Sequence, residues 1–215
     1  MTKTSPTVID RDQLISAFDQ LGHAAVAANT LIDVTVYGGS ALMFASNFRF
    51  ASGDVDIAPI KGDQPKWFSE AVAKIATELG YEEGEDWLND AVGFHLSKLA
   101  EDEKDHFEYG TFPRTGETAG LRVFVPTADY MLALKLKAIR VNDVVKGDQE
   151  RIDIQNLLQV NGVKNIDEAI GIMGRFFPVS AKGAEKQRFY LAQMFTFGEI
   201  AENAPVYPVR AFQAN

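Results

Sequence analysis

The chain has 215 residues, of which 46% are hydrophobic, enough to bury one sizeable core with or without a smaller helical companion. It contains no cysteine, which excludes disulfides, thiolate metal sites and a cysteine nucleophile. The net charge of -9 argues against a general nucleic-acid coat, because phosphate binding depends on clustered lysine and arginine. We find no apolar run of membrane-spanning length and no secretory signal, so we expect a cytoplasmic protein without a membrane partner.

Apolar spacing and turn residues predict the following elements in chain order. They are a helix over 10–28, a strand over 33–37, a glycine turn over 38–40, a short helix over 41–46, a strand over 54–59, a helix over 65–79, an exposed acidic segment over 82–90, strands over 106–112 and 121–125, and helices over 128–142, 150–160, 166–176 and 184–200. This order predicts an α+β fold, with an α/β domain over 1–143 and a helical domain over 144–215.

The glycine turn has the composition of a phosphate-binding segment. Gly38 and Gly39 let the backbone approach a ligand closely, and the helix that follows them presents free N–H groups at its N-terminus. Ser40 adds a hydroxyl group. We therefore predict that these three residues bind phosphates, although a Gly-Gly-Ser turn often has no role beyond turning the chain.

Two carboxylates, Asp54 and Asp56, lie in the second predicted strand. Because side chains alternate along a strand, both acids face one side while Val55 and Ile57 face the core. Their Cα atoms are then about 6.6 Å apart, which suits Mg²⁺ or Mn²⁺ bound together with substrate phosphates. Arg49 precedes this strand and is a candidate phosphate ligand. The plainer interpretation is a solvated acidic face, but the apolar neighbours of the two acids argue against it.

The order of these motifs resembles the signature of polymerase-β-type nucleotidyltransferases. The segments that carry the resemblance are Tyr37-Gly38-Gly39-Ser40-Ala41-Leu42, Phe48-Arg49-Phe50 and Asp54-Val55-Asp56. They are most similar to uncharacterised and AbiEii-toxin-like bacterial families, and shorter similarities extend from about residue 10 to 195, for example over 86–92 and 121–125.

The resemblance implies a nucleotidyltransferase-like mixed sheet and an enzyme that uses Mg²⁺ or Mn²⁺. Such an enzyme transfers a nucleoside monophosphate from an NTP to an RNA, such as tRNA, or to a protein. By analogy it also implies a toxin–antitoxin or phage-defence component with an antitoxin partner. Members carry a third carboxylate on a neighbouring strand, for which Glu108 is the best candidate. The plainer interpretation of Glu108, which we favour, is an exposed acid in an acidic neighbourhood. A second hypothesis therefore stays open, a catalytically degenerate member that binds a nucleotide or a protein partner.

Lys135 occupies an apolar face of the helix predicted over 128–142. The residues three and four positions away from it are Met131, Leu132, Ala138 and Ile139. A lysine on a buried face needs a partner or a path to solvent. It binds either the triphosphate of a nucleotide or a carboxylate, such as Asp153 or Glu150, in a structural ion pair.

Basic residues are densest between positions 135 and 151, and three more follow between positions 182 and 188. They are Lys135, Lys137, Arg140, Lys146, Arg151, Lys182, Lys186 and Arg188. If they gather on one face, they form a local phosphate-binding surface for an RNA acceptor. The alternative is ordinary surface charge, and the sequence does not decide between the two.

Overall fold

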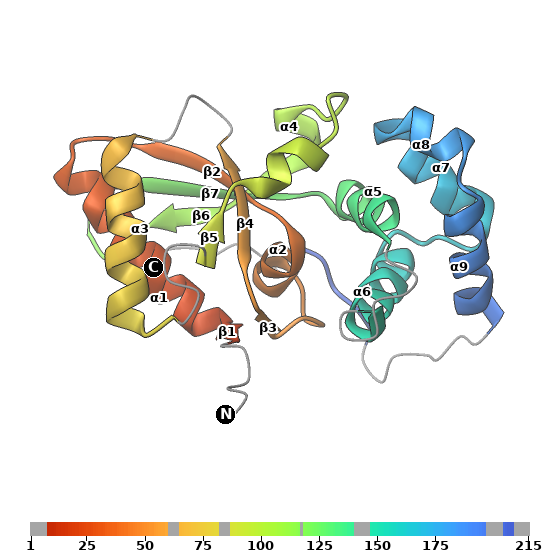
Figure 1. The fold of residues 1–215 in the computed structure, drawn as a ribbon, viewed down its shortest axis with the longest axis horizontal. Coiled ribbons are helices and arrows are strands. Elements are labelled where there is room, and N and C mark those ends of the chain that lie inside the picture. The colour runs from red at the N-terminus through yellow and green to blue at the C-terminus, as the bar shows by residue number, and fades with distance from the viewer. Residues whose placement is uncertain are drawn as a thin grey trace, which may run out of the picture.

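The computed structural model describes residues 8–59, 65–81, 87–116, 118–139, 147–196 and 204–208, and within these ranges the protein is a mixed α+β structure (Figure 1). The strands are β1 (Ile9–Asp10), β2 (Ile32–Val36), β3 (Ala51–Ser52), β4 (Val55–Pro59), β5 (Leu88–Asn89), β6 (His106–Phe112) and β7 (Leu121–Pro126). The helices are α1 (Arg11–Ala27), α2 (Gly38–Ala45), α3 (Lys66–Leu79), the 3-10 helix η2 (Ala91–His95), α4 (Asp102–Asp105), α5 (Ala128–Ala138), α6 (Gly147–Val160), α7 (Ile166–Phe176), α8 (Pro178–Lys182) and α9 (Glu185–Thr196).

The main sheet is mixed and has the strand order β5-β4-β2-β7-β6. β2 pairs antiparallel with β4 and parallel with β7, while β6 pairs antiparallel with β7. β5 adds to the outer side of β4 in parallel. β1 and β3 form a separate two-stranded antiparallel ladder. The strand that carries Asp56 is therefore next to one edge of the sheet, and β6 forms the opposite edge.

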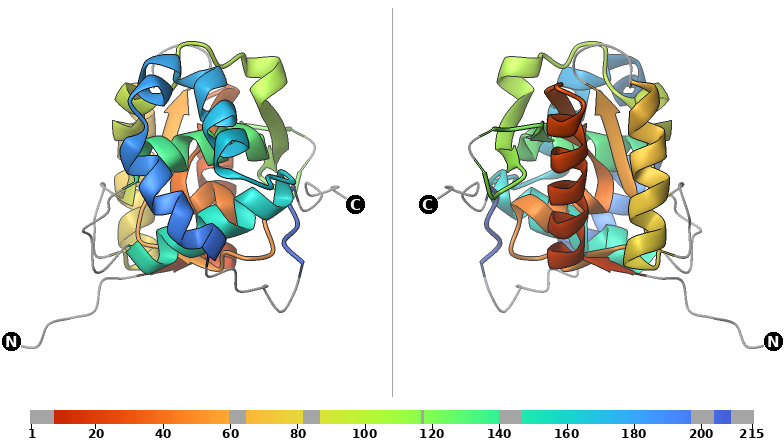
Figure 2. Two further views of the ribbon diagram at one scale, coloured as in Figure 1. Left: turned by 90° about the vertical axis from the view of Figure 1, so that its right-hand side faces the viewer. Right: turned by 90° about the vertical axis from the view of Figure 1, so that its left-hand side faces the viewer.

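The helices surround the sheet in two groups. α1 and α3 pack side by side, as the right-hand view of Figure 2 shows. α5 to α9 lie at the other end of the long axis, and α2 lies between them and β4 (Figure 1). α5 packs against α6 and α7. None of the helices in the described ranges is long and apolar enough to cross a membrane.

Local sequence features account for the start of α1 and the end of α3. Asp10 caps α1 by accepting a hydrogen bond from the backbone of Gln13, whose side chain accepts in turn from the Asp10 N–H. Gly80 ends α3 in the left-handed region, with φ of 69°. Phe68, Val72 and Ile75 of α3 are buried, and their spacing of three and four residues puts them on one face of the helix.

Two predictions were wrong in detail. Gly38 to Ser40 form the first turn of α2 and do not precede it. The segment over 82–90 was predicted to be exposed, yet Trp87 and Leu88 are buried. Trp87 donates its indole N–H to the Val72 carbonyl at 3.2 Å and packs against the Tyr81 ring. Residues 82–86 of this segment lie outside the described ranges. The predicted domain boundary at 143/144 also lies outside them.

Gly22 permits close packing of α1 against the end of β6, and replacing it by alanine is expected to destabilise the fold. A Cβ atom at this position would lie 2.4 Å from the backbone carbon of Phe112. Overpacking of this kind typically costs about 1–3 kcal/mol, which exceeds the roughly 1 kcal/mol that alanine gains over glycine in a helix. Urea unfolding of Gly22→Ala measures the loss.

The matched control for this substitution is Gly171→Ala in α7. Gly171 is also helical and has no heavy atom within 4 Å of an added Cβ. This change is expected to stabilise the protein by about 0.5–1 kcal/mol. Equal effects of the two substitutions would contradict the close contact at Gly22.

Candidate functional site

The predicted phosphate-binding turn and the two predicted metal ligands meet where β2 passes into α2. The Tyr37 N–H donates to the Asp56 carbonyl at 2.9 Å, which continues the β2–β4 ladder by one residue. Val55 and Ile57 are fully buried, as alternation predicted. Asp54 is exposed and Asp56 is half-buried. The backbone of β4 therefore holds Asp56 directly beside the start of α2.

Gly38 and Gly39 are required by their surroundings. Gly38 adopts the left-handed region with φ of 64°, and a Cβ atom there would lie 2.7 Å from the Asp56 Oδ2 atom. A Cβ on Gly39 would lie 2.8 Å from the Ser52 hydroxyl oxygen and 3.0 Å from Arg49 Nη2. The first turn of α2 thus passes between a carboxylate on one side and a guanidinium on the other.

Ser40 has a different contact from the one predicted for it. Its side chain is buried, and its hydroxyl donates to the Asp54 carbonyl at 2.7 Å. This hydrogen bond ties the first turn of α2 to the residue that precedes β4. In the structure Ser40 therefore positions the Asp54 backbone, and the backbone N–H groups of the turn are the donors that face outward from the helix end.

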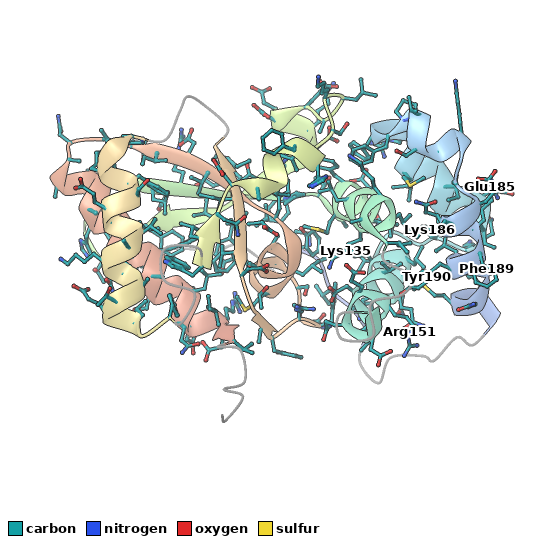
Figure 3. The ribbon with its side chains drawn as sticks, viewed as in Figure 1. Lys135, Arg151, Glu185, Lys186, Phe189 and Tyr190 are labelled. Atoms are coloured by element: carbon teal, nitrogen blue, oxygen red, sulfur yellow. The ribbon has the colours of Figure 1, made fainter. Side chains whose placement is uncertain are left out.

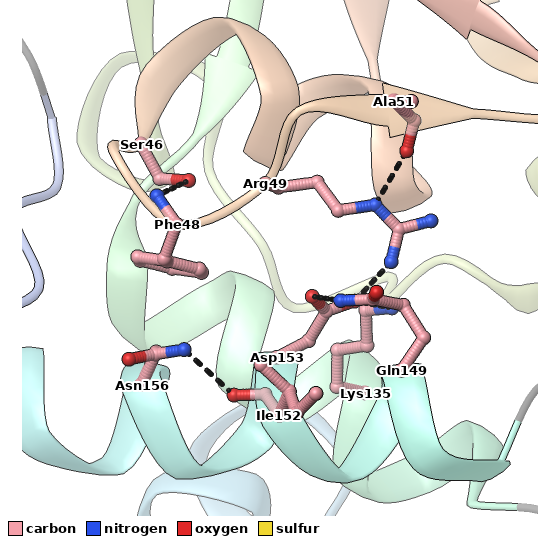
Figure 4. A network of polar contacts seen from close by, with 9 residues as sticks. All are labelled: Ser46, Phe48, Arg49, Ala51, Lys135, Gln149, Ile152, Asp153 and Asn156. Atoms are coloured by element: carbon pink, nitrogen blue, oxygen red, sulfur yellow. Dashed lines mark hydrogen bonds and ion pairs between the residues drawn. The ribbon is translucent and has the colours of Figure 1, made fainter. Parts of the chain in front are cut away.

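Arg49 and Lys135 converge on one buried carboxylate, that of Asp153 in α6 (Figure 4). The Asp153 Oδ2 atom lies 2.8 Å from Lys135 Nζ and 3.2 Å from Arg49 Nη1. Gln149 donates to the other oxygen at 3.1 Å, and Arg49 Nε donates to the Ala51 carbonyl at 2.7 Å. The Asp153 side chain is 0% exposed, against 16% for Arg49 and 14% for Lys135.

In this network Lys135 is paired with a carboxylate. The structural ion pair was one of the two interpretations of Lys135, and Asp153 is the carboxylate that forms it. Among the ion pairs of the described residues, two cations share this single carboxylate, so this group of three keeps an excess of one positive charge. Because Arg49 Nη2 also lies against Gly39, that excess charge is placed next to the glycine turn. A phosphate at the start of α2 would meet both the helix N-terminus and this charge.

Asn89 is a neighbour of the carboxylates that sequence analysis did not single out. It is the register partner of Asp56 in the parallel β4–β5 pairing. Partners in register point to the same face, so an amide stands beside the Asp56 carboxylate. The only sequence signal was its place in the segment over 86–92, and the pairing of such a short strand has no local signature.

The structure does not bring Glu108 to the carboxylate pair. Glu108 is exposed on β6, and β2 and β7 separate that strand from β4. Three strand spacings correspond to about 14 Å. Within the described ranges no group of three or more His, Cys, Asp or Glu side chains is arranged to hold a metal ion. Asp54 and Asp56 offer the oxygen ligands that Mg²⁺ prefers, but the third carboxylate expected at Glu108 is not beside them.

The predicted basic surface is divided among separate contacts within the protein. Lys137 donates to the His95 carbonyl, Lys186 donates to the Ile139 carbonyl, and Arg188 pairs with Asp167. Figure 3 shows Lys186 farther into the helical part than Lys135. Arg140 and Lys146 lie outside the described residues. The cations that the structure describes therefore act mainly as local structural partners.

A buried polar cluster lies behind the glycine turn. The Tyr37 hydroxyl lies 2.9 Å from His106 Nε2, and both rings pack against Tyr130. Among the described residues, His106 Nδ1 has no hydrogen-bond partner. Burial lowers the pKa of His106, and the negative charges of Asp102 and Asp105 act against this shift. Burial also raises the pKa of Tyr37, so both groups are neutral near pH 7.

The lowered pKa of His106 gives the protein a specific pH dependence. The neutral imidazole contributes fully to stability above the unfolded-state pKa of about 6.5, and this contribution is lost as the pH falls below it. We expect the urea midpoint to fall between pH 7.5 and 5.5, and to fall less in His106→Gln, which does not titrate. Equal slopes for the two proteins would show that His106 does not contribute.

No family model, curated protein or solved structure matches this chain. The motifs and the geometry at the start of α2 are therefore the features from which the function is inferred.

Proposed function

We propose that this protein is a metal-dependent nucleotidyltransferase. It would transfer a nucleoside monophosphate from an NTP to a hydroxyl group of an RNA, such as tRNA, or of a protein. The observation that carries the proposal is the approach of the Asp56 carboxylate to Gly38 at the N-terminus of α2. A site for anionic phosphate and a ligand for a divalent cation are thereby in contact, as a metal–NTP complex requires.

Each residue has a stated role in this proposal. The backbone of Gly38 and Gly39 holds phosphate oxygens, and Ser40 holds Asp54 in place through its backbone carbonyl. Arg49 and Lys135 supply positive charge beside the phosphates, and Asp153 orients both of them. Asp54 and Asp56 would hold Mg²⁺ or Mn²⁺, which when bound activates the attacking hydroxyl and neutralises the leaving pyrophosphate.

The transfer balances without a further reactant. The acceptor oxygen forms a bond to the α-phosphorus, the bond from that phosphorus to the bridging oxygen breaks, and pyrophosphate leaves with the electron pair. The hydroxyl proton is released to solvent.

We also propose a finer architecture for the chain, with a nucleotidyltransferase-like domain over 1–143 and a helical domain over 144–215. By analogy with AbiEii-type toxins, we also propose an antitoxin as a protein partner.

A degenerate member that binds a nucleotide without transferring it is the second candidate. Two observations favour it. Glu108 is distant from the pair in strand order, and the residue in register with Asp56 is an amide, Asn89. Such a protein would still bind a metal–NTP complex through the glycine turn, so binding and transfer need separate measurements.

The test of transfer uses each α-labelled NTP with Mg²⁺ or Mn²⁺ and either total tRNA or cell lysate as acceptor. We expect the wild type to label an acceptor in at least one combination, and the Asp54→Asn, Asp56→Asn double variant to label none. Both proteins must show the same unfolding midpoint for the comparison to hold. If no acceptor were labelled with any nucleotide and either metal, the proposed transferase activity would be contradicted. The degenerate nucleotide-binding protein would then be the remaining candidate.

A further inference from the structure

Phe94 is the most exposed large apolar side chain that the structure describes, at 93%. It lies in η2, which follows β5 directly and has no buried residue. Exposed apolar residues are common in proteins, so exposure alone carries no argument. Two further features of Phe94 indicate a binding role: its position beside the proposed metal site and the hydrogen bonds that hold η2.

η2 is held firmly although it has no buried residue. At its start, the Ala91 N–H donates to the Asn89 side chain at 3.2 Å. At its end, Lys137 donates to the His95 carbonyl at 2.8 Å. Two residues later, Ser97 donates its N–H to the Tyr130 hydroxyl at 3.0 Å and its hydroxyl to the Phe176 carbonyl at 2.6 Å. These contacts with β5, α5 and α7 hold the backbone that carries Phe94 in a defined place.

The same segment borders the proposed metal site. Asn89 is in register with Asp56, and η2 packs against β4 (Figure 1, between β5 and α4). η2 begins two residues after Asn89 and rises about 2.0 Å per residue, so the backbone of Phe94 lies on the order of 10 Å from Asn89 along the chain. Phe94 is therefore within about one nucleotide length of the residue that is in register with Asp56.

We propose that Phe94 stacks on the nucleobase of the donor NTP. This inference rests on the proposed function, because the phosphates must be held at α2 and β4 for the base to reach η2. A phenylalanine ring offers an apolar face and no hydrogen bond, so it binds any base by stacking and distinguishes bases weakly. The site would then accept several nucleotides, with preference set by the stacking strength of the base.

The experiment compares two probes that differ in the base. Mn²⁺–NTP and Mn²⁺–tripolyphosphate are titrated calorimetrically into wild type, Phe94→Ala and Phe94→Trp. The control variant is Phe189→Ala, a 63%-exposed phenylalanine on α9 at the far side of the helical part (Figure 3). We expect Phe94→Ala to weaken NTP binding roughly 5- to 150-fold and to leave tripolyphosphate binding unchanged. Phe189→Ala is expected to bind Mn²⁺–NTP with the wild-type affinity. Phe94→Trp is expected to bind it with the wild-type affinity or more tightly.

The other outcomes overturn the inference in distinguishable ways. If Phe94→Ala binds the NTP as tightly as the wild type, or binds both probes equally more weakly, Phe94 does not stack on the base. The proposed function is not affected by either result. NTP affinity unchanged together with weaker binding of an RNA acceptor assigns Phe94 to the acceptor and makes the donor assignment wrong. Wild type that binds neither probe overturns the inference together with the proposed function.

Discussion

Replacing Asp153 by alanine is expected to lower the free energy of unfolding by about 3–5 kcal/mol. The Asp153 carboxylate is fully buried and bonded to Arg49, Lys135 and Gln149. Its removal leaves two cations close together and largely shielded from water, with their shared partner gone. Urea denaturation followed by circular dichroism measures the change as a lower midpoint at constant slope.

The control for this prediction is an exposed ion pair in the same helical part. Asp167 pairs with Arg188 at 2.7 Å, but its side chain is 82% exposed. Solvent screens such a pair, and Asp167→Ala is expected to cost about 1 kcal/mol or less. If Asp153→Ala proved no more destabilising than Asp167→Ala, the buried network could not be holding Arg49 and Lys135 in place.

Replacing Gly38 by alanine is expected to reduce the proposed nucleotide transfer about 100-fold or more. The added Cβ would lie 2.7 Å from Asp56 Oδ2, so either the carboxylate or the first turn of α2 must move. A misplacement of about 1 Å at a reacting site can lower a rate on the order of 100-fold. The transfer assay measures this loss, and Mn²⁺–NTP titration shows how much of it arises in binding.

Gly80→Ala separates the effect on the site from the effect on the backbone. Gly80 also has positive φ, at 69°, but an added Cβ there meets no atom within 4 Å. Both substitutions cost the roughly 1–2 kcal/mol of placing alanine in the left-handed region. Only Gly38→Ala should impair transfer. Equal activity of the two variants would show that the Gly38–Asp56 contact has no part in function.

The elements with strong local signals were predictable from the sequence. α1 has a capping box at Asp10, and α3 has buried residues at helical spacing with Gly80 at its end. The two-residue strands β1, β3 and β5 and the short helices α4 and α8 were not predicted. Two-residue strands exist only because a partner strand is nearby, and no propensity within the chain specifies them.

The candidate site divides in the same way. Gly38, Asp54 and Asp56 are close in sequence, so motif order was enough to propose that they act together. Asp153 was one of two partners considered for Lys135, and only the packing of α6 against α5 selects it over Glu150. Glu108 was placed by strand propensity alone. Strand order, which depends on contacts between distant segments, puts Glu108 on the opposite edge of the sheet from β5.

The most direct test of the central claim is the metal dependence of NTP binding. Calorimetric titration of an NTP into the wild type should show binding with Mn²⁺ or Mg²⁺ and little or none with EDTA. The Asp54→Asn, Asp56→Asn double variant, if it unfolds at the same urea midpoint as the wild type, should lose the metal-dependent component of NTP binding. Binding that needs no metal, or that survives in the double variant, would contradict the assignment of Asp54 and Asp56 as metal ligands.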